Sequence, residues 1–173
     1  MSKVLVVLVL LLGAAAAYVA TRPDAYHVER STTVDAPAAT VFAQIDDLSV
    51  WKEWSPWEKK DPAMKRSFSG PQDGKGARYA WEGKKAGAGS MEITEAKPSS
   101  QVSLRLDFTK PFKANNLVDF TMVARGDSTD VTWEMHGPMS FVSKIMHVVI
   151  NTDRMVGKDF DKGLANLKAI AEK

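Results

Sequence analysis

The sequence predicts an α+β protein in which a long C-terminal helix packs against one antiparallel sheet, with an apolar helix at the N-terminus. Three observations predict this class. Residues 4–20 are apolar and uncharged. Many stretches between residues 26 and 136 alternate apolar and polar side chains, as strands with one buried face do. From residue 153 onward, apolar side chains recur at intervals of three and four, as they do along an amphipathic helix.

The composition fits a single globular domain without disulfides. The 173 residues are 45% hydrophobic and 25% charged, and cysteine is absent, which excludes disulfides and thiolate chemistry. Two of the 23 basic residues, Lys3 and Arg22, flank the N-terminal apolar segment, which leaves 21 basic and 21 acidic residues for the rest. Because this remainder is neutral and has no basic stripe, we do not expect nucleic-acid binding.

The apolar segment VLVVLVLLLGAAAAYVA, residues 4–20, has the composition of a membrane span at the short end of the usual length range. Lys3 precedes it, and Arg22 and Pro23 end it. A core helix of a soluble domain would carry a polar face, which this segment lacks. We therefore predict an uncleaved single-pass anchor at residues 1–22.

The charges that flank this segment favour a cytoplasmic N-terminus, with the domain at residues 23–173 on the other side of the membrane. In a bacterium, the domain would then lie at the periplasmic face of the inner membrane. A cleaved signal peptide is the alternative, because the alanines at 14–17 are small residues of the kind that signal peptidase recognises.

The domain begins with a predicted strand and two short helices. The stretch YHVERSTTV, residues 26–34, alternates as a strand does. Residues 37–45 begin with proline, which suits a first helical turn, and place apolar side chains at helical spacing. Residues 47–54 predict a second short helix, which we expect to end before Pro56.

Further strands follow, separated by turns rich in glycine, proline, aspartate and serine. They are expected at residues 65–69, 77–82, 88–96, 101–108, 117–124 and 128–136. Their outward phase carries acidic residues that we expect to pair across strands with Arg78 and Arg105, namely Glu82, Glu92, Asp107, Asp119 and Glu134. Their inward phase is apolar and consists, with Val28 of the first strand, of Tyr79, Trp81, Met91, Ile93, Leu104, Leu106, Phe108, Val118, Phe120, Met122, Trp133 and Met135.

The C-terminus changes to a helical period. Residues 141–150 are strongly apolar, and residues 153–173 predict a long amphipathic helix whose stripe is Val156, Phe160, Leu164, Leu167 and Ile170. Gly157 and Gly163 lie within this helix, where each costs about 1 kcal/mol relative to alanine. We expect these glycines either to let the helix approach the sheet closely or to kink it.

Four stretches carry a resemblance to a known family: VERSTTVDAPAATVFAQIDDLSVWKEWSPW, KPF at 110–112, VTWEMHGPMSF at 131–141 and GKDFDKGLANLK at 157–168. Together with the order of elements, they resemble the SRPBCC superfamily of START-like, birch-pollen-allergen-type domains, and within it the polyketide cyclase/dehydrase-like branch. The resemblance covers residues 26–172. It implies a helix-grip fold, in which a curved antiparallel sheet wraps around the long C-terminal helix with a hydrophobic cavity between them. Members bind lipids, sterols, polyketides or other apolar ligands, and some are enzymes.

The segment LSVWKEWSPWEKKD concentrates Trp51, Trp54 and Trp57 in one short stretch. By the resemblance, the two short helices close one end of the sheet, so these indoles either pack into the core or line the mouth of the cavity. A filled core is the alternative to a cavity that periodicity alone does not exclude. We expect ligand contacts from the inward sheet face, from one indole and from the histidine of the apolar run: Trp54, Tyr79, Trp81, Met91, Ile93, Leu104, Leu106, Phe108, Phe120, Met122, Trp133, Met135 and His147.

We predict no catalytic residue, no metal site and no cofactor. His27 and His136 fall on the outward phase of their strands, and the three histidines lack the spacing of metal ligands. No glycine-rich phosphate loop opens a helix after a strand.

The predicted function is membrane-anchored binding of a hydrophobic small molecule or lipid, rather than catalysis. One alternative is a polyketide cyclase or dehydratase that uses the same cavity, with His147 and Tyr79 as candidate acid or base. Another is a protein-binding module, which the charged outward phase of the sheet disfavours.

Overall fold

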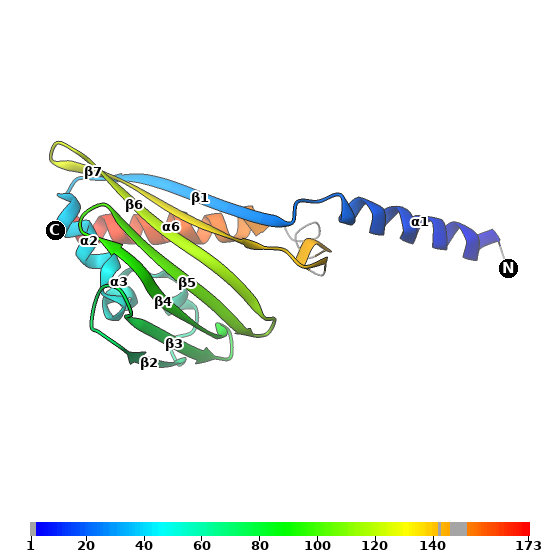
Figure 1. Ribbon diagram of the computed structural model, residues 1–173, viewed down its shortest axis with the longest axis horizontal. Helices are drawn as coiled ribbons and strands as arrows, with labels where there is room; N and C mark the ends of the chain where they lie inside the picture. The colour runs from blue at the N-terminus through cyan, green and yellow to red at the C-terminus, as the bar shows by residue number, and fades with distance from the viewer. Residues whose placement is uncertain (1–2, 142, 146–151) are drawn as a thin grey trace.

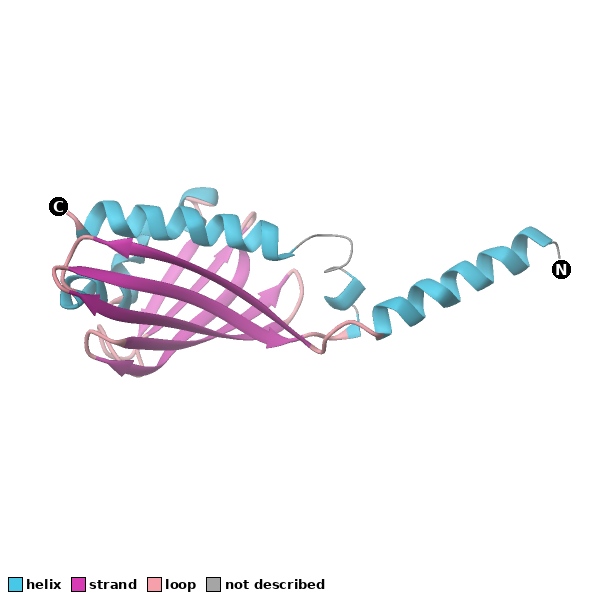
Figure 2. Cartoon of the chain, turned by 90° about the horizontal axis from the view of Figure 1, so that it is seen from above, coloured by secondary structure: helices cyan, strands magenta, loops and turns pink. Residues whose placement is uncertain are grey.

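A computed structural model describes residues 3–141, 143–145 and 152–173. Within these residues a seven-stranded antiparallel sheet curves around a C-terminal helix, α6 (Figures 1 and 2). The strand order is β1-β7-β6-β5-β4-β3-β2, so the first strand pairs with the last and the others follow as a meander. The strands are β1 Ala25–Val34, β2 Lys65–Ser69, β3 Arg78–Gly83, β4 Gly87–Lys97, β5 Gln101–Lys110, β6 Ala114–Arg125 and β7 Ser128–Pro138. The expected α+β helix-grip class is confirmed.

Helix α6, Thr152–Ala171, lies on the concave face of the sheet and supplies one side of the core. Phe160, Leu164 and Leu167 are buried there. The Phe160 ring stacks on Trp133 of β7 with a centroid distance of 4.1 Å. A Cβ added to Gly163 would lie 2.7 Å from the Trp133 indole, so glycine allows the helix to approach the sheet at this point. Close approach, one of the two roles expected for this glycine, is therefore confirmed.

The short helices that follow β1 in the chain and precede β2 close one end of the sheet. They are α2 Ala38–Asp46, the 3-10 turn η1 Leu48–Val50, α3 Trp51–Trp54 and α4 Pro56–Lys60. Helix α3 ends before Pro56, as predicted, but the proline begins a further helix that the sequence analysis did not predict. Proline suits the first helical position because the N–H that it lacks has no partner within the helix there.

Helix α1, Lys3–Ala20, extends away from the domain (Figures 1 and 2). It is long and apolar enough to cross a membrane, and a signal sequence would have the same character. At its end the Arg22 guanidinium lies 4.3 Å from the centre of the Tyr18 ring, a cation–π contact. Strand β1 begins shortly after, at Ala25.

On the outward face of the sheet, the predicted pairing across strands with Arg78 and Arg105 is found for Glu92. The other acidic residues have different partners: Asp107 pairs with Arg105 on its own strand, Glu82 pairs with Lys110, Glu134 lies near histidines, and Asp119 accepts a hydrogen bond from Ser103. Arg105 of β5 contacts Glu92 at 2.6 Å and Asp107 at 3.2 Å, and Arg78 of β3 contacts Glu92 at 2.9 Å. Each of these arginines is half or more exposed, so each pair contributes little stability. Their effect is to keep this face charged and solvated while the opposite face is buried.

Candidate ligand-binding cavity

A cavity of about 600 Å³ lies between the concave face of the sheet, α6 and the short helices. Its walls are mainly apolar. Most of the inward residues predicted to contact a ligand line it: Tyr79, Trp81, Met91, Leu104, Leu106, Phe108, Trp133 and Met135. The volume falls within the range of small-molecule sites, about 300–1,000 Å³.

The other predicted contact residues lie elsewhere. Trp54, Ile93, Phe120 and Met122 belong to the solid part of the core, where all four are buried, and are absent from the cavity wall. The reason is that the short helices pack on this end of the sheet and fill the space. His147 lies outside the described residues.

The tryptophan-rich segment divides between core and cavity. Trp51 and Trp54 are buried, and their indole N–H groups donate to the carbonyl oxygens of Ile45 and Gln44, both at 2.9 Å. Trp51 borders the cavity, whereas Trp54 does not. Trp57 lines it from α4, with its ring 5.6 Å from that of Trp133. The segment therefore seals one end of the sheet and also forms part of the cavity wall.

Several wall residues lie outside the strands' inward phase. For Trp57 the cavity mouth is one of the two predicted places, and the other residues were not predicted. Trp57, Met64 and Phe112 come from the short helices and from connections between strands, while Val156 and Phe160 come from α6. The apolar stripe of α6 is readable in the sequence, so its part in the wall could have been predicted. The wall residues in connections between strands are placed by the path of the chain through each turn, and the periodicity of the sequence does not predict that path.

A charged pair and a tyrosine form the first polar group of the wall. Glu58, from α4, is buried, and its Oε1 accepts a 2.6 Å hydrogen bond from the hydroxyl of Tyr79 on β3. Its Oε2 accepts a 2.7 Å bond from Nε of Arg66 on β2. Burial, reinforced by the hydrogen bond to Glu58, raises the pKa of Tyr79, so this hydroxyl remains protonated. Glu58 was not predicted as a wall residue because it lies on α4, a helix that the sequence pattern does not indicate.

A second polar group lies across the cavity. The hydroxyl of Tyr26 on β1 donates to Oδ1 of Asn116 on β6 at 2.6 Å, and both residues line the wall. Burial raises the pKa of Tyr26 to about 12. The indoles of Trp81 and Trp133 also line the wall and add two N–H groups to it. Trp81 donates to the carbonyl of Ala86 at 3.2 Å, while Nε1 of Trp133 is buried without a hydrogen-bond partner in the described part of the chain.

The cavity opens at the end of the domain that lies near the N-terminal helix. Its lining there includes the exposed residues Phe112, Lys113 and Ser140. The neighbouring backbone N–H of Met139 donates to the carbonyl of Asp24 at 2.7 Å, directly before β1 begins. The opening is therefore linked by hydrogen bonding to the segment that joins the domain to α1.

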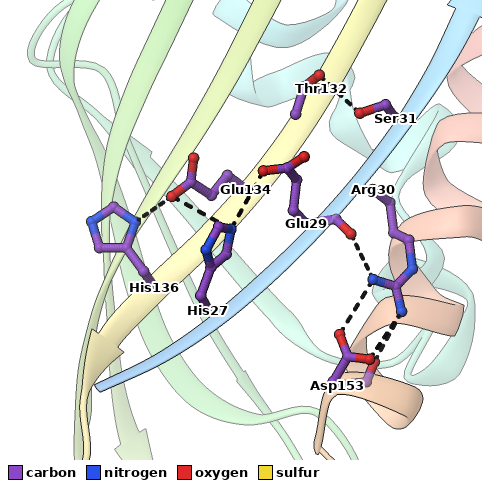
Figure 3. A network of polar contacts seen from close by, with 8 residues as sticks. All are labelled: His27, Glu29, Arg30, Ser31, Thr132, Glu134, His136 and Asp153. Carbon is purple, nitrogen blue, oxygen red and sulfur yellow. Dashed lines mark hydrogen bonds and ion pairs between the residues drawn. The ribbon is translucent and has the colours of Figure 1, made fainter. Parts of the chain in front are cut away.

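A group of potential metal ligands lies on the opposite face of the sheet. His27, Glu29 and Glu134 each offer one ligand atom, and the three atoms lie within 4.8 Å of one another (Figure 3). The spacing of the three histidines along the sequence does not indicate a metal site, and none was predicted. The group becomes visible only when the pairing of β1 with β7 is known.

The profile of the polyketide cyclase/dehydrase and lipid transport family matches residues 25–172. No curated protein matches the chain in sequence. Among solved structures, protein CV1439 from Chromobacterium violaceum is similar over 88% of this chain and 99% of its own, with 14% identity and a TM-score of 0.62.

Two further solved structures share the fold. Ara h 8.0201 aligns with 85% of this chain and 97% of its own, at 11% identity and a TM-score of 0.58. DynU16, a putative protein of the dynemicin biosynthetic locus, aligns with 88% of this chain and 48% of its own, at 14% identity and a TM-score of 0.61. At these identities the similarity establishes the fold and leaves the ligand open.

Proposed function

Because the chain belongs to the polyketide cyclase/dehydrase and lipid transport family, we propose that it binds a hydrophobic small molecule or a lipid in the cavity beside α6. The observation that carries this proposal is the apolar wall of a space large enough for such a ligand. Binding is driven by desolvation, at roughly 25 cal/mol for each Å² of apolar surface removed from water. Methionine and aromatic side chains, such as Met91, Met135 and Trp81, suit a ligand whose shape varies.

The polar groups of the wall limit which ligands fit. The carboxylate of Glu58 already accepts hydrogen bonds from Tyr79 and Arg66, and Tyr26 donates to Asn116. These polar groups therefore need few hydrogen bonds from a ligand. A ligand that is mainly apolar leaves both groups undisturbed. A ligand with many polar groups would lose its hydrogen bonds to water without finding replacements, at a cost of about 1–3 kcal/mol for each buried group.

Helix α1 serves in this proposal as an uncleaved membrane anchor that holds the domain at the periplasmic face of a bacterial inner membrane. The opening of the cavity near Asp24 supports the arrangement, since an apolar ligand could then pass between bilayer and cavity over a short distance. Phe112, which is 69% exposed at this end, is an apolar side chain that could enter the membrane surface. Mass analysis of the mature chain, with protease protection in spheroplasts, separates an anchor from a cleaved signal sequence.

Displacement of a hydrophobic fluorescent dye from the full chain in detergent micelles tests the binding proposal. The panel contains fatty acids, sterols and aromatic polyketides. Leu106→Trp places a large ring on the cavity wall, and Thr121→Trp places the same ring on the outward face of β6 as the control. We expect at least one ligand class to displace the dye, Leu106→Trp to weaken that displacement about tenfold or more, and Thr121→Trp to leave it unchanged. Equal behaviour of the two variants would contradict binding in this cavity.

Acid–base catalysis in the same cavity is the second candidate function, and the contact between Tyr79 and Glu58 favours it. Once free of Glu58, the protonated hydroxyl can donate to a carbonyl oxygen of a bound polyketide-like substrate, and the Glu58 carboxylate can accept a proton from the carbon next to that carbonyl, which leaves the enol of the substrate. In the geometry observed, both groups are occupied with each other and with Arg66, so a substrate would have to displace the bond between them. If the cavity is catalytic, Tyr79→Phe and Glu58→Gln abolish turnover of the bound molecule while binding persists; unchanged turnover excludes this role.

A further inference from the structure

Two pairs of potential metal ligands face each other across the first and last strands. His27 of β1 lies opposite His136 of β7, and Glu29 lies opposite Glu134. Residues two apart on one strand share a face, so all four side chains lie on the outward side of the sheet (Figure 3). Between these residues, the inward-facing Val28 is buried in the core. The β1–β7 pairing thus gathers two imidazoles and two carboxylates on one surface.

The distances within this group match those of a metal coordination sphere. Nε2 of His27 lies 3.5 Å from Oε2 of Glu29 and 3.7 Å from Oε1 of Glu134. Zinc binds nitrogen and oxygen ligands at about 2.0–2.2 Å in tetrahedral geometry, which separates neighbouring ligand atoms by about 3.3–3.6 Å. Small rotations of half-exposed side chains would be enough to bring the three atoms onto one ion.

The charges of this group also differ from those of the surrounding sheet face. Elsewhere on that face, carboxylates such as Glu92 and Glu82 pair with arginine or lysine. Within the described residues, the ion-pair partners of Glu29 and Glu134 are histidines. Histidine, unlike arginine, is not a permanent cation, so the two carboxylates have no permanent compensating charge beside them, whereas a divalent cation would neutralise both.

His136 completes the surroundings of Glu134. Its Nδ1 lies 3.2 Å from Oε1 of Glu134, but the orientation makes no hydrogen bond, and this buried nitrogen has no other hydrogen-bond partner in the residues described. A small rotation would let it donate to the carboxylate and hold it for a metal, as groups next to metal ligands commonly do. His136 is therefore placed to orient Glu134 toward an ion held by the cluster.

We propose that His27, Glu29 and Glu134 bind a divalent transition-metal ion of the zinc class, with His136 positioning Glu134. One imidazole nitrogen and two carboxylate oxygens suit zinc or cobalt better than calcium, which prefers six to eight oxygen ligands. The ion would tie β1 to β7 next to Tyr26, whose side chain lies in the cavity wall on the other face. The proposal is independent of the cavity's ligand.

Cobalt titration of the untagged full chain, in detergent micelles after treatment with a chelator, tests this site. Tetrahedral cobalt absorbs visible light strongly. We expect the visible absorption to rise until one equivalent of cobalt per chain has been added, and to disappear when zinc displaces the cobalt. Glu134→Gln should weaken binding about 100-fold or more, and His136→Ala about 10–100-fold. Glu92→Gln, the same change on the same sheet face, should leave binding unchanged.

Circular dichroism of each variant separates lost binding from lost folding. The proposal is overturned if the folded wild-type chain takes up no cobalt or zinc. It is also overturned if His27→Ala and Glu134→Gln bind the metal as tightly as the wild type and Glu92→Gln do, since the ion then binds elsewhere on the surface.

Discussion

Two phenylalanines on the inward face of the sheet provide a sharp test of where the core ends and the cavity begins. Phe120 is fully buried and contacts the rings of Trp51, Trp54 and Trp133 at centroid distances of 5.8, 6.1 and 4.8 Å. Phe108 lines the cavity and is only partly buried. The same substitution, phenylalanine to alanine, should therefore have different consequences at the two positions.

Phe120→Ala opens a new void in packed core, which costs about 3–5 kcal/mol. For a chain of this size, each kcal/mol lowers the melting temperature by about 2–4 °C, so a decrease of roughly 6–20 °C is expected. Phe108→Ala enlarges an existing space, with an expected cost of about 1 kcal/mol and a decrease of roughly 2–4 °C. Ligand affinity should move the other way, with about a tenfold loss for Phe108→Ala and little change for folded Phe120→Ala.

Thermal unfolding followed by circular dichroism, on the full chain in detergent, measures the stability difference, and dye displacement measures affinity. Equal losses of stability at the two positions would refute the division of the interior into a solid end and a hollow end. So would a loss of affinity confined to Phe120→Ala.

Three further predictions concern individual contacts. Tyr79→Phe removes the hydroxyl that donates to buried Glu58, so it should lower the free energy of unfolding by about 1–3 kcal/mol in denaturant titration; an unchanged midpoint would show that the bond is dispensable. Gly163→Ala should destabilise the protein, although alanine normally favours a helix by about 1 kcal/mol, because the new Cβ would collide with Trp133; a stabilised variant would contradict the close approach. Asp61 accepts hydrogen bonds of 2.8 Å and 3.1 Å from the backbone N–H groups of Lys85 and Ala86 in the β3–β4 turn. These bonds hold the pKa of Asp61 below its ordinary value of 3.8. The stabilising effect of the ionised carboxylate is therefore present above pH 3.8 and is lost as the pH falls through the lowered pKa. Asp61→Asn should weaken the loss of stability in acid, measured by melting curves between pH 5 and about pH 2. A loss of stability in acid identical to that of the wild type would exclude this contribution.

The architecture could be predicted from the sequence because its elements are periodic over many residues. Alternation in the meander fixed which side chains face inward, and the stripe of Phe160, Leu164 and Leu167 identified the helix that covers them. Helix α4 could not be predicted because it has only five residues and begins with a proline, which also ends the preceding helix.

The boundary between core and cavity could not be predicted in this way. Phe108 and Phe120 both face inward on neighbouring strands, but they lie toward opposite ends of the strand pair, opposite Ala114 and Val102. Alternation reports the shared inward phase and not which end of the sheet the short helices fill. Glu58 and the group around Glu134 were missed for a related reason. Their partners come from distant parts of the chain, so their chemistry depends on strand pairing and helix placement rather than on spacing in the sequence.

Native mass spectrometry of the full chain, purified in detergent from its own cells, shows directly whether the cavity holds a ligand. We expect a co-purifying apolar molecule, recovered by lipid extraction, whose occupancy falls in Leu106→Trp and persists in Thr121→Trp. A chain that is empty and also fails to take up fatty acids, sterols and aromatic polyketides would rule out the proposed binding function.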